Sequence, residues 1–282
     1  MWFLLALLAG LLFAINKLIF RAVFTKQQIN PIFFLAMHDG LAGLLLLPLA
    51  LINTDLPKST PVWLAFLLGV VLIFVANYYA ALALKHTEAS VFQIVGQSRH
   101  IVVLFGAALL FSEPISSIKI FSIFLIILGV IIALKQGSKI RITKGVIYSF
   151  LSTIAIGCAF LFIKIANQDV APVFLASVAL IISGLLSYLI TLFMNKNDSS
   201  FKLPVKLRTP LVVAALIFAI FELVIFTALS IGEASRVTPV SQSSMIFTIV
   251  GAYLFLDERN HLKQKIIGGT IIALGIIVLY FL

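Results

Sequence analysis

Long apolar stretches separated by short polar breaks run through the whole sequence. A helix of about 20 apolar residues spans a hydrocarbon core of roughly 30 Å. Spanning strands would be about 10 residues long with alternating hydrophobicity, which these stretches are not. The sequence therefore predicts an all-α membrane protein with ten transmembrane helices, which we place at residues 2–20, 31–52, 62–84, 89–111, 117–134, 145–166, 171–194, 210–230, 236–256 and 265–282.

Composition supports a membrane location. The chain has 62% hydrophobic residues, only 11% charged residues and a mean hydropathy of +1.20. This leaves too little polar surface to cover a globule in water. We therefore expect a multi-pass protein of the cell membrane (an inner or plasma membrane) in contact with the lipid bilayer.

Part of the sequence is repeated. Residues 88–113 recur 145 positions later, with 11 identities in 26 aligned positions. The repeat includes the polar pair Gln97-Ser98, which returns as Gln242-Ser243 within another apolar stretch. Chance matching of apolar residues does not explain a repeated polar pair, so the chain is predicted to be a duplicated unit.

The duplication predicts the domain organisation. We expect a first five-helix repeat at 1–136, a basic connector at 137–144 and a second five-helix repeat at 145–282. Because five is an odd number, the second repeat enters the membrane upside down relative to the first. Inverted repeats of this kind enclose a central cavity with a binding site near the midplane in many secondary transporters.

The positive charges predict an orientation. Of the 20 Lys and Arg residues, fourteen lie in the loops after odd-numbered stretches, three on the opposite side and three within stretches. By the positive-inside rule, the odd-numbered loops face the cytoplasm and both termini face outward. The net charge of +10 is thereby explained by topology, and we expect no nucleic-acid partner.

Motifs for catalysis or cofactor binding are absent from the sequence. It contains no P-loop, no GxGxxG beside a strand, and no His, Cys and Glu cluster at metal-ligand spacing. Two acids within apolar stretches, Asp39 and Glu222, have no catalytic motif around them. We therefore expect a protein that is not an enzyme and that needs no metal or other cofactor.

The fourth apolar stretch carries a polar stripe. Ser90, Gln93, Gln97 and His100 follow at intervals that place them on one helix face, with Arg99 about 100° away. A charge at the centre of a membrane helix costs about 2.5 to 3.5 kcal/mol, so it needs a partner or a cavity. The corresponding positions of the second copy are less charged.

These patterns predict that the stripes face each other across a water-filled cavity and bind a solute. The predicted substrate-binding residues are Gln93, Gln97, Arg99, His100, Thr238 and Gln242, with Asn77 and Tyr78 from the third stretch. In the alternative interpretation, the glutamines only hold helices together, an interaction worth about 0.6 kcal/mol. Tyr78 has a second interpretation as an interfacial anchor.

The two intramembrane acids have three possible roles. Asp39, which follows His38, and Glu222 are each able to pair with Arg99, to accept a proton as the coupling ion, or to bind a cationic group of the solute. We expect proton coupling or a buried ion pair at Asp39, Glu222 and His38, and the sequence leaves the choice open.

The residues at the ends of the repeated stretches resemble those of a known family. The motifs are Gly232-Glu-Ala-Ser-Arg-Val-Thr-Pro239 with Leu256-Asp-Glu258 in the second half, and Thr87-Glu-Ala-Ser90 with Phe111-Ser-Glu113 in the first. Gly268, Leu274-Gly275 and Leu128-Gly129 complete the pattern. The chain resembles ten-helix members of the EamA-type drug/metabolite transporter superfamily over nearly its whole length. The resemblance implies a basket of helices in which segments such as 3, 4, 8 and 9 line the cavity.

Three features depart from this family. Ile94 stands where members usually have Pro in the fourth segment, and His38 stands where Arg is common in the second. Members also usually keep both termini in the cytoplasm, whereas the charge distribution here predicts the opposite.

Together these observations predict a secondary transporter that moves a small polar or zwitterionic metabolite, such as an amino acid, by alternating access. A proton is the candidate coupling ion. The alternatives are a flippase for a lipid-linked headgroup intermediate and a sugar or nucleoside carrier. We expect a monomer or a weak homodimer.

Overall fold

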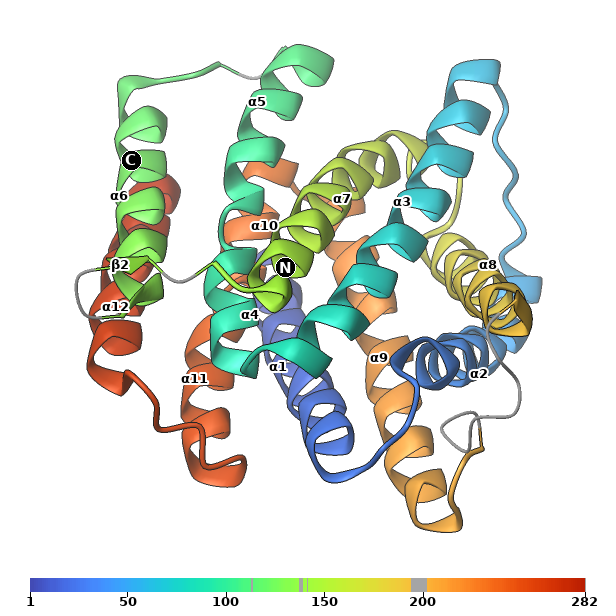
Figure 1. Ribbon diagram of the computed structural model, residues 1–282. Coiled ribbons are helices and arrows are strands. Elements are labelled where there is room, and N and C mark those ends of the chain that lie inside the picture. Colours follow the sequence, from blue (N-terminus) through green and yellow to red (C-terminus); the bar gives the residue numbers. More distant parts are fainter. Residues whose placement is uncertain (113, 137–138, 141, 194–201, 282) are drawn as a thin grey trace.

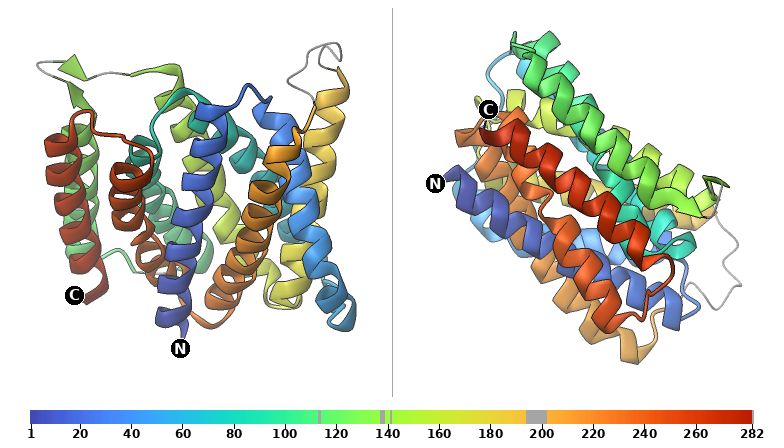
Figure 2. Two further views of the ribbon diagram at one scale, coloured as in Figure 1. Left: turned by 90° about the horizontal axis from the view of Figure 1, so that it is seen from below. Right: turned by 90° about the vertical axis from the view of Figure 1, so that its left-hand side faces the viewer.

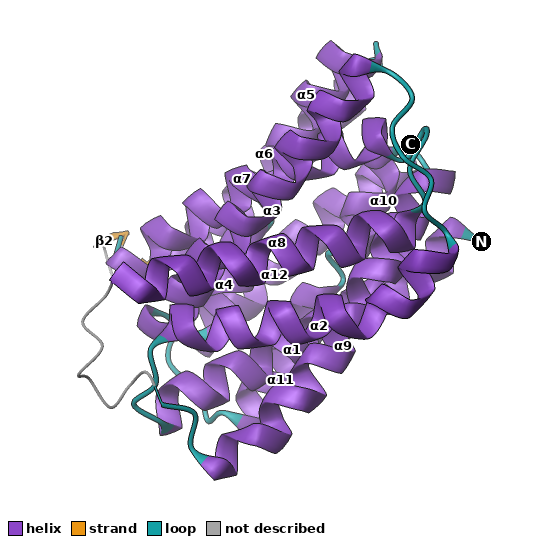
Figure 3. Cartoon of the chain, turned by 90° about the vertical axis from the view of Figure 1, so that its right-hand side faces the viewer, coloured by secondary structure: helices purple, strands orange, loops and turns teal. Residues whose placement is uncertain are grey.

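The computed structural model describes residues 1–112, 114–136, 139–140, 142–193 and 202–281. Its helices are α1 (Trp2–Lys26), α2 (Pro31–Ile52), α3 (Thr60–His86), α4 (Ala89–Gly96), α5 (Arg99–Phe111), α6 (Ser117–Leu134), α7 (Lys144–Ala166), α8 (Pro172–Phe193), α9 (Val205–Ile231), α10 (Ala234–Ser241), α11 (Ser244–Phe255) and α12 (Leu262–Phe281). Within the described residues, eight helical stretches are long and apolar enough to cross a membrane, with α4 and α5 taken as one. The predicted all-α membrane fold is confirmed (Figures 1 and 3).

One small element was not expected. At the start of the basic connector, β1 (Lys135–Gln136), at the end of the first repeat, pairs antiparallel with β2 (Lys139–Ile140). It lies outside the helical bundle and does not change the fold class (Figure 2).

Polar residues in the loops define where several helices begin. The Asn30 side chain accepts hydrogen bonds from the backbone N–H groups of Ile32 and Phe33 at 2.9 and 3.3 Å, just before α2 begins with Pro31. Thr143 accepts from the Val146 N–H at the start of α7. These side chains satisfy amide groups that have no partner within the helix.

Helix packing follows a twofold pattern between the repeats. The most extensive packing joins α3 with α7, α2 with α8, α6 with α12, and α1 with α9. In the two repeats, α1 corresponds to α7, α2 to α8, α3 to α9, and α6 to α12. Exchanging each helix for its counterpart therefore converts the α3–α7 pair into the α9–α1 pair. The same exchange leaves the α2–α8 and α6–α12 pairs unchanged. Two inverted five-helix repeats explain this symmetry.

The repeated polar pair breaks a membrane helix in both halves. Gln97 and Ser98 separate α4 from α5, and Gln242 and Ser243 separate α10 from α11. At the breaks, Ser98 N–H bonds Val95 O and Ser243 N–H bonds Val240 O, both at a spacing of three residues and near 3.0 Å. These 3₁₀-type bonds keep the backbone satisfied, and a mid-helix 3₁₀ turn often marks a hinge.

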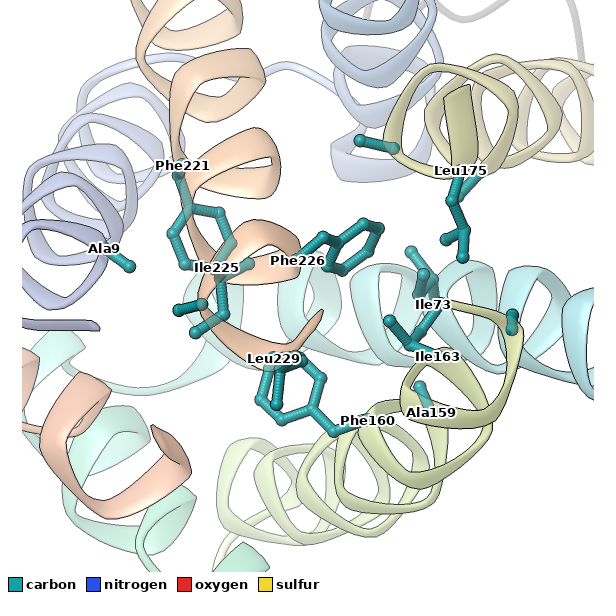
Figure 4. Packing of buried hydrophobic residues seen from close by; sticks show 14 of the residues in the cluster. Ala9, Ile73, Ala159, Phe160, Ile163, Leu175, Phe221, Ile225, Phe226 and Leu229 are labelled. Atoms are coloured by element: carbon teal, nitrogen blue, oxygen red, sulfur yellow. The ribbon is translucent and has the colours of Figure 1, made fainter. Parts of the chain in front are cut away.

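Two apolar clusters lie at opposite ends of the bundle. We call one end the connector end, because it carries the β1–β2 hairpin, and the other the terminal end, because α1 begins and α12 ends there (Figure 2). At the terminal end, side chains of α1, α3, α7, α8 and α9 pack together, including Phe160 and Phe226 (Figure 4). At the connector end, Phe20, Phe34 and Phe92 belong to a second cluster.

Two glycines allow close packing of α2 against α8. A Cβ atom added at Gly184 would lie 2.5 Å from the Gly40 backbone N and 3.0 Å from the Ala36 O, whereas a Cβ added at Gly40 would meet nothing within 4 Å. We therefore predict that Gly184→Ala lowers the free energy of unfolding by about 1 to 3 kcal/mol.

The matched control is Gly40→Ala at the same contact. It is expected to leave stability unchanged or to raise it by about 0.5 to 1 kcal/mol, because alanine favours the helix over glycine. Thermal unfolding of both variants in detergent measures the difference. Equal melting temperatures for the two variants would contradict this account of the packing.

Candidate functional site

A narrow polar cavity lies between the two apolar clusters. Its free volume is about 20 Å³, room for a water molecule. It is lined by side chains from α1, α3, α4, α5, α7 and α9, namely Phe13, Lys17, Ala76, Asn77, Ala80, Phe92, Gly96, Arg99, Ser152, Thr153, Ile156, Phe160, Phe218, Phe221 and Glu222. The resemblance implied a contribution from the ninth segment, but no described residue of α10 or α11 lines the cavity.

Lys17 contributes a buried positive charge to the cavity. The residue is 3% exposed, and no described residue forms a hydrogen bond or ion pair with its ammonium group. The ammonium nitrogen lies 4.7, 5.3 and 5.1 Å from the ring centres of Phe13, Phe20 and Phe218. Ring faces attract a cation but do not neutralise it, so the charge remains available to an anionic group.

Arg99 contributes a second positive charge, held by the two helix breaks. Its Nε donates to the Gly96 carbonyl at 3.3 Å, and its guanidinium carbon lies 5.6 Å from the ring centre of Phe160. When the Gln242 amide oxygen faces the guanidinium, it accepts from Nη2, Nη1 and Nε at 2.7, 2.8 and 3.1 Å. An amide orients the guanidinium without cancelling its charge.

Gln242 has a second possible donor. In the opposite amide orientation, its oxygen accepts from Gln97 Nε2 at 3.1 Å, while Gln97 Nε2 also donates to the Gln93 carbonyl at 2.9 Å. One oxygen cannot face both groups, so the amide joins either the opposite helix break or Arg99. The Gln242 amide therefore binds either its counterpart Gln97 or the cavity cation Arg99, depending on its orientation.

Glu222 contributes the only negative side chain among the described cavity residues. It is 3% exposed, and neither a hydrogen bond nor an ion pair joins its carboxylate to any described residue. A carboxylate that is removed from bulk water and left without a partner is costly. Such a group is suited to taking up a proton or a cation from the cavity.

Asp39 is the opposite case, because its carboxylate is fully engaged. Oδ1 lies 2.7 Å from His38 Nδ1, and Oδ2 accepts from Asn77 Nδ2 at 3.0 Å and from Ser183 Oγ at 2.5 Å. On the far side, His38 Nε2 lies 3.0 Å from Asn16 Nδ2. This buried network ties α1, α2, α3 and α8 together next to the cavity, and Asn77 is its only member that lines the cavity.

Several predicted substrate contacts lie outside the cavity lining. Gln93 Nε2 donates to Ser244 Oγ at 3.0 Å and to Thr248 Oγ1 at 3.2 Å, and Thr238 Oγ1 donates to the Ala234 carbonyl. His100 is buried, and neither of its ring nitrogens has a partner in the described part of the chain. Tyr78 packs against the rings of Phe74 and Tyr79.

Sequence reasoning missed Lys17, Ser152 and Thr153. Lys17 lies near the end of the first predicted stretch (2–20), where lysines are commonly found at a membrane interface, but α1 continues to Lys26 and places Lys17 well inside the bundle. Ser152 donates to the Ala76 carbonyl at 2.8 Å, across the α3–α7 contact. Mildly polar residues of this kind carry no sequence signal that separates cavity positions from helix contacts.

Comparison with known proteins decides the family. The model of the EamA-like transporter family matches the chain twice, at residues 1–135 and 143–281. The chain belongs to the EamA-like transporter family. No curated protein matches it. A solved structure described only as "Crystal structure of protein" is similar, with a TM-score of 0.68 and 14% identity over 97% of this chain and 95% of the other. At this identity the likeness concerns the fold alone.

Membership of the EamA-like family establishes the general activity. The protein is a multi-pass membrane transporter of the drug/metabolite transporter superfamily, it has a small-molecule substrate, and it is not an enzyme. The cavity described above is the part of this EamA protein in which buried charged groups from both repeats meet.

The two buried acids are predicted to respond differently to truncation. Asp39→Ala leaves three donors without an acceptor and is expected to lower the free energy of unfolding by about 3 to 5 kcal/mol. Glu222→Ala removes an unpaired buried charge and is expected to leave stability unchanged or to raise it. Thermal unfolding in detergent compares the pair. A larger loss of stability in Glu222→Ala than in Asp39→Ala would contradict this account of the two acids.

Proposed function

We propose that this EamA-family protein is a secondary carrier for a small zwitterionic metabolite such as an amino acid. The substrate carboxylate would bind Lys17 and Arg99, and its ammonium group would bind Glu222. The observation that supports this is the presence of two cations and one carboxylate, none in an ion pair with a described residue, around one enclosed cavity.

Electrostatics favours a charged substrate over a neutral one. Each buried ion loses hydration, and that loss is offset only when an opposite charge or several hydrogen bonds replace the water. A zwitterion supplies opposite charges to both the cations and the acid. A sugar or nucleoside has no such charges, so it would leave Lys17, Arg99 and Glu222 uncompensated.

The cavity walls favour a substrate with an apolar part. Besides the charged groups, the lining is largely aromatic, with side chains from α1, α4, α7 and α9: Phe13, Phe92, Phe160, Phe218 and Phe221. Binding sites for small molecules commonly combine such apolar walls with a few placed polar groups. Asn77 and Thr153 supply additional polar atoms on the walls.

Glu222 is the better proton site of the two acids. Its carboxylate faces the cavity and has no described partner, whereas that of Asp39 is held by His38, Asn77 and Ser183. In the proposed cycle, Glu222 binds the substrate ammonium group or a proton, but not both. Such competition is a simple way to couple opposite movements of substrate and protons.

Transport requires the cavity to widen. At about 20 Å³ it is too small for an amino acid, and apolar clusters close it toward both ends of the bundle. We infer that the two repeats rock against each other and that the breaks at Gln97-Ser98 and Gln242-Ser243 bend during this motion.

The first experiment is a thermal-shift screen of the purified protein against amino acids, nucleosides, sugars and amines. A ligand that binds only the folded state raises the melting temperature. The best amino acid is then compared with its amide, which lacks the carboxylate, and with its N-acetyl derivative, which lacks the ammonium group.

We predict that the parent protein transports the amino acid in proteoliposomes and rejects both derivatives by at least about tenfold. Lys17→Met and Arg99→Ala are expected to abolish transport of the amino acid or to remove the discrimination against the amide. Glu222→Gln is expected to lose discrimination against the N-acetyl derivative and to lose proton movement, followed with an internal pH dye.

The matched controls are Lys58→Met and Asp55→Asn, which remove the same charges from exposed loop positions. Both are expected to transport at the parent rate. Parent-like activity in the three cavity variants would overturn the proposed site. Movement of a lipid-linked headgroup without uptake of any free solute would instead support the flippase alternative.

A further inference from the structure

A polar pocket opens at the connector end, on the boundary between the two repeats. Its volume is about 230 Å³, and its lining includes Arg21, His86 and Glu88 from the first repeat and His261 and Lys265 from the second. None of these residues lines the central cavity. We call this pocket the connector mouth.

Glu258 forms a bridge between the repeats at the connector mouth. One carboxylate oxygen accepts from Arg21 Nε and from the Ala89 N–H, each at 3.0 Å. The other accepts from the N–H and hydroxyl of Ser90 at 3.3 and 3.2 Å. A carboxylate of the second repeat thus holds the first turn of α4 and a cation of α1, both in the first repeat.

A second bridge lies beside the first. Lys265 of α12 is 2% exposed, and its ammonium group pairs with the Glu88 carboxylate just before α4 begins. Asn260 Nδ2 also donates to Glu88, at 3.1 Å. Both bridges therefore join the start of α4 to the α11–α12 region of the other repeat.

The bridges hold the start of α4, the helix that contributes residues to both the connector mouth and the cavity. Along α4, Val91 lines the mouth, Ser90 bonds Glu258, and Phe92 and Gly96 line the cavity. Opening the cavity toward this end would move the start of α4 away from the second repeat. Each bridge would then have to break.

The other ion pairs in the described parts of the loops lack these features. Arg236 pairs with Glu233 three residues away, and Arg259 pairs with Asp257 two residues away, and all four side chains are more than half exposed. Such pairs contribute little to stability. By contrast, the Glu258 side chain is 6% exposed, and its partners belong to the opposite repeat.

We propose that Glu258 with Arg21, and Lys265 with Glu88, form a double ionic gate that closes the connector end. The gate must open each time the cavity faces that side. When the repeats separate, water entering the mouth hydrates the four charges, so the cost of breaking the buried pairs is partly offset. The proposal rests on alternating access under the proposed function.

Accessibility of a cavity cysteine tests the gate. The natural Cys158 is first replaced by Cys158→Ser, and the cavity reporter is introduced by Ala80→Cys. A membrane-impermeant, charged thiosulfonate is then applied from the connector side of sealed vesicles. Glu258→Gln in this background is expected to raise the rate of labelling at least about tenfold, because the open state becomes more populated.

Three further variants sharpen the result. Arg259→Gln, next to Glu258 but in an exposed pair, is the matched control and is expected to leave the labelling rate unchanged. Lys265→Glu is expected to raise the rate, and adding Glu88→Lys to it is expected to restore slow labelling, because the exchanged charges again pair. The restored rate separates a gate from simple loss of stability.

The gate and the proposed function fail in distinguishable ways. Labelling uses no substrate, so faster labelling supports the gate even when no zwitterion is transported. If Glu258→Gln and Lys265→Glu both purify as folded protein and label at the parent rate, the gate is overturned, whatever the transport assay shows. If Glu258→Gln does not fold, the labelling rates of Lys265→Glu and of Lys265→Glu combined with Glu88→Lys decide alone.

Discussion

A polar group without a partner is costly in lipid, and this constraint governs the structure at every level. It requires backbone amides to bond within helices, and it permits a break in a spanning helix only where protein surrounds it. The breaks at Gln97-Ser98 and Gln242-Ser243 meet this condition, because short-range hydrogen bonds pair their backbone N–H groups. The same constraint makes Lys17, Arg99 and Glu222 informative, since each is a buried ionisable group that forms no ion pair with a described residue.

Duplication supplies the scaffold, and divergence between the copies supplies the chemistry. The twofold helix packing places α4 against α11 and α5 against α10, so the two helix breaks lie side by side. The cavity charges do not follow this symmetry. Arg99 has Ser244 as its counterpart in the second copy, so the guanidinium comes from one half while the amide that orients it comes from the other. A site that needs residues from both repeats is altered whenever the repeats move against each other.

Hydrophobic length predicted the ten segments and the membrane class, because these depend on local composition, and the repeated segment with an odd number of helices predicted the inverted repeats. Hydrophobic length did not predict where the helix breaks lie, since apolar residues continue on both sides of Gln97 and Ser98, and a glycine such as Gly96 is common within membrane helices. Lys17 was missed for a related reason: α1 extends six residues beyond its predicted end at residue 20, which moves the lysine from the edge into the interior. Contacts between distant residues, such as Asp39 with Ser183, have no local signal and become visible only in the folded chain.

Closure at both ends of the cavity makes it costly to hold the like charges of Lys17 and Arg99 near each other when no substrate is bound. In a water-filled cavity, Lys17 and Arg99 would be screened, whereas the closed cavity has room for a water molecule and little screening. Closure without a bound anion is therefore electrostatically unfavourable, and a bound carboxylate removes that cost. The ionic bridges at the connector end and the apolar cluster beneath them oppose opening. The balance between these two effects makes closure depend on the substrate, which a carrier needs so that it does not leak when empty.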